Sequence, residues 1–259
     1  MSDIFDKKSE EELKRHESNW YKSKLTDRKK NVIIQKFTND NIIVSKEMFL
    51  VNIKKLSGFE GSYYFNGKDP LVNTALQMIE NDNMDIKDIF LYNYYENFQP
   101  KTYGEVYYLN KNNKLHELES TNFFLPWFHK NPTNTFRAGL FGPKDFTSVK
   151  HRFIRIKNLI NNIKEYGYIP SDNDIIEGYI LLKDNDFRFI ITAGHHRVAV
   201  LTALYMNNNV EYENIEVKYD IKRINVKIVD ENNVCNWPGV ESNYLSQYDA
   251  LEMFNQFFK

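Results

Sequence analysis

One short stretch of this 259-residue chain gathers several groups that can bind an anion. Gly194 is followed directly by His195, His196 and Arg197, and Thr192 stands just before it. Arginine offers a planar fork of donors, and histidine changes its charge near neutral pH. Glycine has no Cβ, so a ligand can approach its backbone closely. These residue types in this order predict a phosphate site, with the arginine facing the ligand.

Two apolar segments flank this stretch and must position it. Phe187 to Ile191 is rich in β-branched and aromatic residues, which predicts a strand, and Val198 to Leu204 predicts a buried helix. The N-terminus of a helix favours an anion through its exposed N–H groups and its dipole. A glycine turn that only caps a helix is the simpler alternative. However, three polar residues lie between two core segments, and each buried polar group without a partner costs about 1–3 kcal/mol. We therefore favour the interpretation in which they face a ligand.

A strand, the residues Gly194-His195-His196-Arg197 and an Ala/Val/Leu-rich helix together resemble the signature of the ParB/sulfiredoxin superfamily, whose motif is Gly-x-x-Arg. The resemblance covers roughly Gly142 to Asp230. It implies that Gly194 and Arg197 hold nucleotide phosphates. It also matches His196 to the histidine of sulfiredoxin and His195 to that of the ADP-dependent serine kinases.

The chain departs from each of these families outside the motif. Sulfiredoxin has a cysteine where His195 stands, and the single cysteine here is Cys235, so reduction of a sulfinic acid is not expected. The serine kinases have an acid where Ala193 stands. ParB proteins place a helix-turn-helix DNA reader after the fold, whereas only Glu231 to Lys259 follows here.

Composition limits the class of protein. The net charge of −1 and the pI near 6.6 do not favour nucleic acid as a general partner, apart from a local basic face. A hydrophobic share of 42% is ample for a packed core. One cysteine excludes an internal disulfide. Met1 to Lys30 lacks the apolar segment of a signal peptide, and no apolar run reaches the roughly 18 residues of a membrane span, so we expect a cytoplasmic protein.

Hydrophobic periodicity and helix caps predict the order of the elements. The expected strands are Asn31–Phe37, Asn41–Val44, Ile175–Leu182, Phe187–Ile191 and Arg223–Val229, with Asp184 to Asp186 turning the third into the fourth. The expected helices are Glu10–Lys24, Lys46–Leu56, Pro70–Glu80, Lys101–Leu109, one from Thr147 to Gly167 with Thr147 or Ser148 as N-cap, Val198–Leu204, and one opened by Ser246. Asp85 to Phe98 is aromatic-rich, which is typical of a packed helix face; a base-stacking platform is the alternative.

An irregular stretch divides the chain. Phe123 to Phe128 is interrupted by Pro126, and Pro132 to Pro143 continues the irregular connection. We expect these aromatic residues to dock the two halves rather than to cover a ligand. The prediction is a mainly helical region at residues 1–135 and a nucleotide-binding domain with a C-terminal helix at residues 136–259.

Charged residues outside the motif supply further candidates. Glu177 lies in the middle of an apolar strand, where a carboxylate faces either solvent or a site, and it could act as a general base or organise Mg²⁺. The helix after Thr147 has a basic surface, which either is solvated or meets the distal phosphates of a nucleotide; it comprises Lys150, His151, Arg152, Arg155 and Lys157.

The fold expected is α+β: a ParB/sulfiredoxin-like C-terminal domain with a small mixed sheet, preceded by a mainly helical region. The resemblance implies a nucleotide-binding protein, and the favoured activity is transfer of a phosphoryl group from ATP or ADP, with Mg²⁺, to a small molecule or a glycan. A glycan acceptor follows from a resemblance to uncharacterised ParB-like proteins associated with surface-polysaccharide genes. The alternative is a non-catalytic, nucleotide-gated binding protein, in which binding of CTP or ATP changes the affinity for DNA or a protein partner. A nuclease is a third possibility, for which the sequence has no clear metal triad.

The residues assigned to this activity come from the motif and its neighbouring strand. Catalytic candidates are Glu177, His195 and His196, and nucleotide-binding candidates are Thr192, Gly194, His195, His196 and Arg197. No protein metal site is expected. Adjacent histidines lie about 100° apart on a helix, which makes His195 and His196 poor joint ligands of a structural zinc ion.

Overall fold

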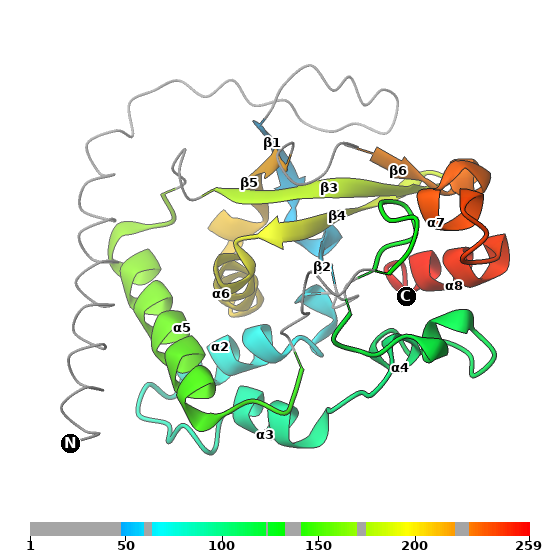
Figure 1. Cartoon of the computed structure of the whole chain (residues 1–259). Helices are drawn as coiled ribbons and strands as arrows, with labels where there is room; N and C mark the ends of the chain where they lie inside the picture. Colours follow the sequence, from blue (N-terminus) through cyan, green and yellow to red (C-terminus); the bar gives the residue numbers. More distant parts are fainter. Residues whose placement is uncertain (1–47, 60–63, 123, 133–140, 170–174, 221–227) are drawn as a thin grey trace.

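The computed structural model describes residues 48–59, 64–122, 124–132, 141–169, 175–220 and 228–259 (Figure 1). The chain is an α+β protein with one mixed, curled sheet and helices packed around it, so this part of the expected fold is confirmed. The expected helix Glu10–Lys24 and the expected strands Asn31–Phe37 and Asn41–Val44 lie outside the described residues.

Six strands of the described chain form the sheet. They are β1 (Met48–Asn52), β2 (Leu56–Gly58), β3 (Ile176–Lys183), β4 (Asp186–Ala193), β5 (Asn214–Tyr219) and β6 (Ile228–Asp230). The order is β1-β5-β3-β4-β2, and β6 also pairs with β3. Strand β3 is central: its first half lies parallel to β5, its second half lies parallel to β6, and β4 runs antiparallel along its other edge.

The hairpin of β3 and β4 confirms one prediction. Lys183 pairs with Asp186 across the turn, and Asp184 adopts a positive φ of 49°. Aspartate tolerates this left-handed conformation better than most residues, which explains its place in the turn. The hairpin brings the end of β4 back to the start of β3, where the motif lies.

The prediction of a helix at Lys46–Leu56 is wrong. This segment supplies β1, the 3-10 helix η1 (Ile53–Lys55) and β2. Strand β1 pairs antiparallel with β5, and β2 pairs parallel with β4. Strand preference depends on the partner strand and on burial more than on the local residues, so a short segment at a sheet edge escapes a periodicity argument.

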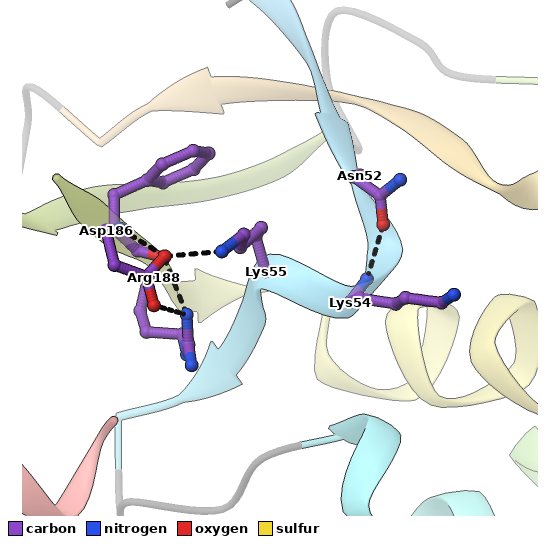
Figure 2. A network of polar contacts seen from close by, with 6 residues as sticks. Asn52, Lys54, Lys55, Asp186 and Arg188 are labelled. Carbon is purple, nitrogen blue, oxygen red and sulfur yellow. Dashed lines mark hydrogen bonds and ion pairs between the residues drawn. The ribbon is translucent and has the colours of Figure 1, made fainter. Parts of the chain in front are cut away.

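A polar network holds η1 against the sheet (Figure 2). Lys55 forms an ion pair with Asp186 at the start of β4, and the Arg188 Nη1 atom donates to the other carboxylate oxygen of Asp186 at 2.8 Å. Asn52 caps η1 by accepting from the N–H of Lys54 at 3.0 Å. These contacts fix the turn that carries the chain from β1 to β2.

Strand β5 was not predicted, and the predicted strand Arg223–Val229 is described only from Ile228 onward, within β6. Residues 214–219 alternate between exposed or half-buried and buried positions, with Ile215, Val217 and Tyr219 inside. That alternation is the ordinary signal of a half-buried strand.

Seven α-helices are described. They are α2 (Pro70–Glu80), α3 (Phe90–Asn97), α4 (Tyr103–Val106), α5 (Phe146–Tyr166), α6 (His195–Met206), α7 (Pro238–Glu241) and α8 (Gln247–Gln256). Four further 3-10 helices are η2 (Tyr64–Asn66), η3 (Lys114–Glu117), η4 (Val210–Tyr212) and η5 (Glu231–Asn236). None of the described helices is long and apolar enough to span a membrane.

Helix caps explain several boundaries. Helix α2 begins at Pro70, as predicted, and Asp69 caps it by accepting from two backbone N–H groups. Ser246 caps α8, also as predicted. The cap of α5 was predicted wrongly: Asp145 accepts from the Ser148 N–H at 2.8 Å, which starts the helix one residue before Thr147.

Helices α2, α5 and α6 cover one face of the sheet, and α4, α7 and α8 pack with the other. Side chains of β3 contribute to a hydrophobic core on each face of the sheet. Ile176 and Ile180 belong to the first core, beside α2, α5 and α6, and Tyr179 and Leu181 belong to the second, on the other face. Trp127 belongs to the second core, and its indole N–H donates to the Tyr179 hydroxyl at 3.2 Å. This contact supports the docking interpretation of the irregular aromatic stretch. The sheet itself takes strands from both sides of residue 135.

Candidate functional site

Gly194 forms the junction between β4 and α6. It is the N-cap of α6 and has a φ of +95°, which L side chains rarely adopt. A Cβ atom there would lie 3.0 Å from Cγ1 of Ile176 and 3.2 Å from its Cα. The glycine is therefore required by its backbone conformation and by packing against β3, in addition to any approach of a ligand.

The first turn of α6 presents backbone donors. The first hydrogen bond of the helix runs from the Val198 N–H to the Gly194 carbonyl at 3.0 Å. The N–H groups of the three residues between them point out of the helix N-terminus, as in any α-helix. Glycine has no side chain with which to cap them. The positive end of the helix dipole adds to the attraction for an anion.

His195 is held in place by two aromatic residues. Its Nδ1 atom shares a hydrogen bond of 2.7 Å with the hydroxyl of Tyr64, which is 1% exposed. The ring of Phe59 lies edge-on to the imidazole, with 5.3 Å between the ring centroids. The hydrogen bond at Nδ1 and the contact with Phe59 fix the orientation of the imidazole ring.

His196 is half-buried, and its Nε2 atom is buried without a hydrogen-bond partner among the described residues. Burial lowers the pKa of His196 well below its usual range, and Arg155, Arg152 and His195 lower it further by charge repulsion. The two arginines come from α5, whose basic surface therefore reaches the start of α6. Cations from two helices converge here.

Arg197 is buried rather than open to solvent, since only 6% of the residue is exposed. It lies beside Tyr168, which follows α5. Burial raises the pKa of the Tyr168 hydroxyl to about 12; the nearby guanidinium opposes this rise, and Glu216 of β5 adds to it. Arg197 thus has structural neighbours of its own, so its substitution would affect packing as well as binding.

Thr192 links β4 to β3 and to Asp220, the residue that follows β5. Its hydroxyl donates to the Oδ2 atom of Asp220 at 2.6 Å and lies 3.3 Å from the Glu177 carbonyl oxygen. The ladder shifts register beside Thr192, because Glu177 pairs with Ala193 while Gly178 pairs with Ile191. Such a bulge re-aims side chains at a strand end. Asp220, 3% exposed, is anchored by its own N–H, which donates to the Gly178 carbonyl at 2.9 Å.

Glu177 lies next to the motif in the sheet. Its Cα pairs with those of Ala193 and Lys218, and the residue is half-buried. No hydrogen bond or ion pair joins its carboxylate to the described residues. The sheet pairing thus places the Cα of Glu177 beside the strand end that leads into α6, and a half-buried carboxylate is suited to accept a proton or to take part in binding a cation.

The structure brings the predicted residues together at the ends of β4 and β5 and the start of β3. Thr192, Gly194, His195, His196 and Arg197 are consecutive or nearly so, and Glu177 adjoins them through the sheet. Sequence reasoning missed Asp220 and Tyr64. A carboxylate directly after the alternating residues 214–219 was a usable signal for Asp220, whereas Tyr64 lies 131 residues from its partner and had none.

No group of three or more His, Cys, Asp or Glu side chains that could hold a metal ion occurs among the described residues. A magnesium ion bound with a nucleotide needs less, because one or two carboxylates together with phosphate oxygens hold it. Glu177 and Asp220 supply two carboxylates at this end of the sheet; Asp220 contacts Thr192 through its carboxylate, and Glu177 contacts it through its backbone carbonyl.

Comparison of the chain with protein-family models, with curated proteins and with solved structures found no match.

Proposed function

We propose that the chain binds the phosphates of a nucleotide at the N-terminus of α6 and transfers a phosphoryl group from ATP or ADP to a small molecule or a glycan. The observation that carries this proposal is the start of α6: a left-handed Gly194 without a side-chain cap, followed by His195, His196 and Arg197. Backbone donors at this helix N-terminus, with the Arg197 guanidinium in its first turn and Arg152 and Arg155 of α5 nearby, favour a polyanion.

The surroundings of the motif support a reactive role. Tyr64 and Phe59 orient His195, which is one candidate to exchange a proton with the acceptor. Glu177 is the second candidate for that proton, since it has a half-buried carboxylate at the same strand end. Phosphoryl transfer depends mainly on positioning and on charge stabilisation, and both kinds of group are present. The ParB/sulfiredoxin resemblance remains part of this proposal.

Mg²⁺ would be held by Glu177 and Asp220 together with the phosphates, and it would neutralise charge on them. Arg152 and Arg155 would meet the distal phosphates. Their repulsion of a proton on His196 indicates that this corner of the molecule is electropositive.

Calorimetry with ATP, ADP and CTP, each with and without Mg²⁺, tests the binding step. Ligand at 100 times its dissociation constant stabilises the fold by about 2.7 kcal/mol, which a thermal shift detects. Arg197→Lys keeps a cation but loses the guanidinium fork, so we expect it to weaken binding by about 1.5–3 kcal/mol. If no nucleotide binds the wild-type protein, the whole proposal fails.

Glu177→Gln tests the transfer step. It should leave nucleotide affinity within about tenfold yet lower phosphoryl transfer to sugar or amino-acid acceptors by about 10²-fold. Glu213→Gln, on an exposed position before β5, is the matched control and should change neither quantity. If there is no turnover but nucleotide changes the affinity for DNA or a protein, the nucleotide-gated alternative replaces the kinase.

A further inference from the structure

A hollow of about 770 Å³ opens beside α4, built entirely from residues outside the α6 site. It is lined by aromatic, polar and small residues: Phe98, Gln99, Pro100, Gly104, Glu105, Tyr108, Leu109, Lys111 and His116. The volume is within the range of small-molecule sites, which combine apolar walls with a few oriented polar groups.

Tyr108 forms one wall of the hollow. It is 74% exposed, more than any other large hydrophobic residue among those described. Its ring stacks on Phe98, with 5.8 Å between the centroids and 21° between the planes. Phe98 in turn packs against Tyr94 and Phe141, so the exposed ring rests on a rigid aromatic base.

The backbone at Tyr108 is unusual for a tyrosine. Its φ is +53°, and it directly follows Tyr107, the C-cap residue of α4. The Tyr108 N–H donates to the Glu105 carbonyl at 3.2 Å, and the Leu109 N–H donates to the Gly104 carbonyl at 2.9 Å. This is the Schellman arrangement, in which glycine usually occupies the left-handed position. A tyrosine there costs stability relative to glycine and projects a ring into solvent, so the backbone does not account for this side chain.

The polar rim of the hollow is pre-organised. Glu105 accepts from the N–H groups of Lys101 and Thr102 through one oxygen, and these bonds lower the pKa of its carboxyl, so it is an ionised acceptor. The Gln99 amide nitrogen is anchored on the Glu96 carbonyl at 3.0 Å. The lining holds one acid, Glu105, and one lysine, Lys111, whose charges balance, together with His116.

From these features we propose that the hollow binds a neutral saccharide, with one sugar ring stacked on Tyr108 and its hydroxyl groups bonded to Glu105, Gln99 and Lys111. The C–H groups of a sugar ring pack well on the electron-rich face of an aromatic ring, and the hydroxyl groups match a rim of mixed donors and acceptors. A nucleotide fits less well, because its phosphates would face Glu105 with a single cation nearby.

Saturation-transfer NMR on the full chain tests this site with maltotriose, cellotriose and N,N′,N″-triacetylchitotriose, followed by titration of whichever sugar responds. We expect at least one sugar to bind, and Tyr108→Gly to weaken its binding by about tenfold or more. Tyr248→Gly is the matched control, since that tyrosine is 68% exposed on α8, and it should leave binding within about twofold.

Glycine suits the backbone of position 108, so this variant is expected to fold, and circular dichroism of both variants checks that it does. If none of the three sugars binds, or if Tyr108→Gly binds as the wild type does, the proposal is overturned. Adenosine and cytidine belong in the same screen; binding of a nucleoside, in place of the sugars, that depends on Tyr108 would reassign the hollow to a nucleobase. Nucleotide binding at α6 is measured separately, so either proposal can fail while the other stands.

Discussion

Helix α6 begins and helix α4 ends at a residue with a positive φ, yet the two positions carry opposite kinds of residue. Gly194 has a φ of +95° and packs against Ile176, where a Cβ atom would be only 3.0 Å from the isoleucine side chain. Tyr108 has a φ of +53° and holds its ring in solvent. At the first position the residue suits the backbone, and at the second it does not.

The two positions differ in what determines the residue: at Gly194 it is the fold, and at Tyr108 it is the exposed surface. At Gly194 the backbone and the neighbouring strand both demand glycine, so this residue by itself says little about a ligand. At position 108 glycine would fit the left-handed backbone better than tyrosine does, so the backbone does not explain the tyrosine side chain. At α6, therefore, the residues that point to a ligand are His195, His196 and Arg197, whereas at α4 the residue with the positive φ itself does so.

Replacing Gly194 with alanine should cause the largest loss of stability. The left-handed conformation costs about 1–2 kcal/mol for a residue with a Cβ, and displacing Ile176 adds about 1–3 kcal/mol. We expect urea denaturation to give a total loss of about 2–5 kcal/mol.

Gly67→Ala is the control for that measurement. Gly67 has a φ of +72°, but a Cβ there meets nothing within 4 Å in the described chain, so only the backbone penalty of about 1–2 kcal/mol applies. An equal loss at both glycines would mean that the contact with Ile176 contributes nothing, and the packing account of Gly194 would be wrong.

Thr192→Val should cause the next largest loss. The valine keeps the shape of threonine but removes the 2.6 Å hydrogen bond to the buried Asp220, and a hydrogen bond to a charged group contributes about 1.5–3 kcal/mol. Thr202→Val is the matched control: its hydroxyl is buried without a hydrogen-bond partner among the described residues, so valine should be neutral or stabilising there. Similar losses at the two threonines would remove the special role assigned to Thr192 and Asp220.

Local signals predicted much of this structure. Pro70 marked the start of α2, Ser246 marked the cap of α8, and the turn at Asp184 to Asp186 marked the β3–β4 hairpin. Each of these depends on residues within a few positions of one another. The motif at Gly194 was found in the same way, since a strand, a glycine and a helix follow in sequence.

Features that depend on distant partners were missed. Strand β1 was mistaken for a helix because its conformation is set by pairing with β5, which lies more than 160 residues later in the chain. The contact of Tyr64 with His195 and the bond of Thr192 to Asp220 join separate segments in the same manner. The burial of Arg197 could not be inferred either, because it depends on neighbours such as Tyr168 that lie elsewhere in the sequence.

His196 should make stability depend on pH. Burial and the neighbouring arginines lower its pKa in the folded state, so the unfolded chain binds the proton more tightly. The contribution of His196 to the free energy of unfolding is therefore complete above the unfolded pKa of about 6.5. It decreases as the pH drops below that value, by up to about 1.4 kcal/mol per pH unit. His196→Gln should abolish this part of the slope between pH 6.5 and pH 5.5.

Denaturant titrations at these two pH values measure the effect. His129→Gln is a useful comparison, because burial also lowers the pKa of His129, with a backbone hydrogen bond to Leu125 opposing the shift. A pH slope unchanged in His196→Gln would show that His196 titrates normally, and the electropositive corner proposed for the α6 site would lose its support.

Substitutions at Tyr108 should have the smallest effect on stability and the most unusual order. Tyr108→Ala loses the stack on Phe98, about 0.5–1.5 kcal/mol, while the left-handed strain remains. Tyr108→Gly loses the same stack but relieves the strain, so we expect it to be about 1 kcal/mol more stable than Tyr108→Ala and close to the wild type. This order reverses that of a helix interior, where alanine is the more stable of the two. Urea denaturation of the three proteins decides the matter: an alanine variant as stable as the glycine variant would mean that position 108 is not strained, and the contrast between the two helix ends would disappear.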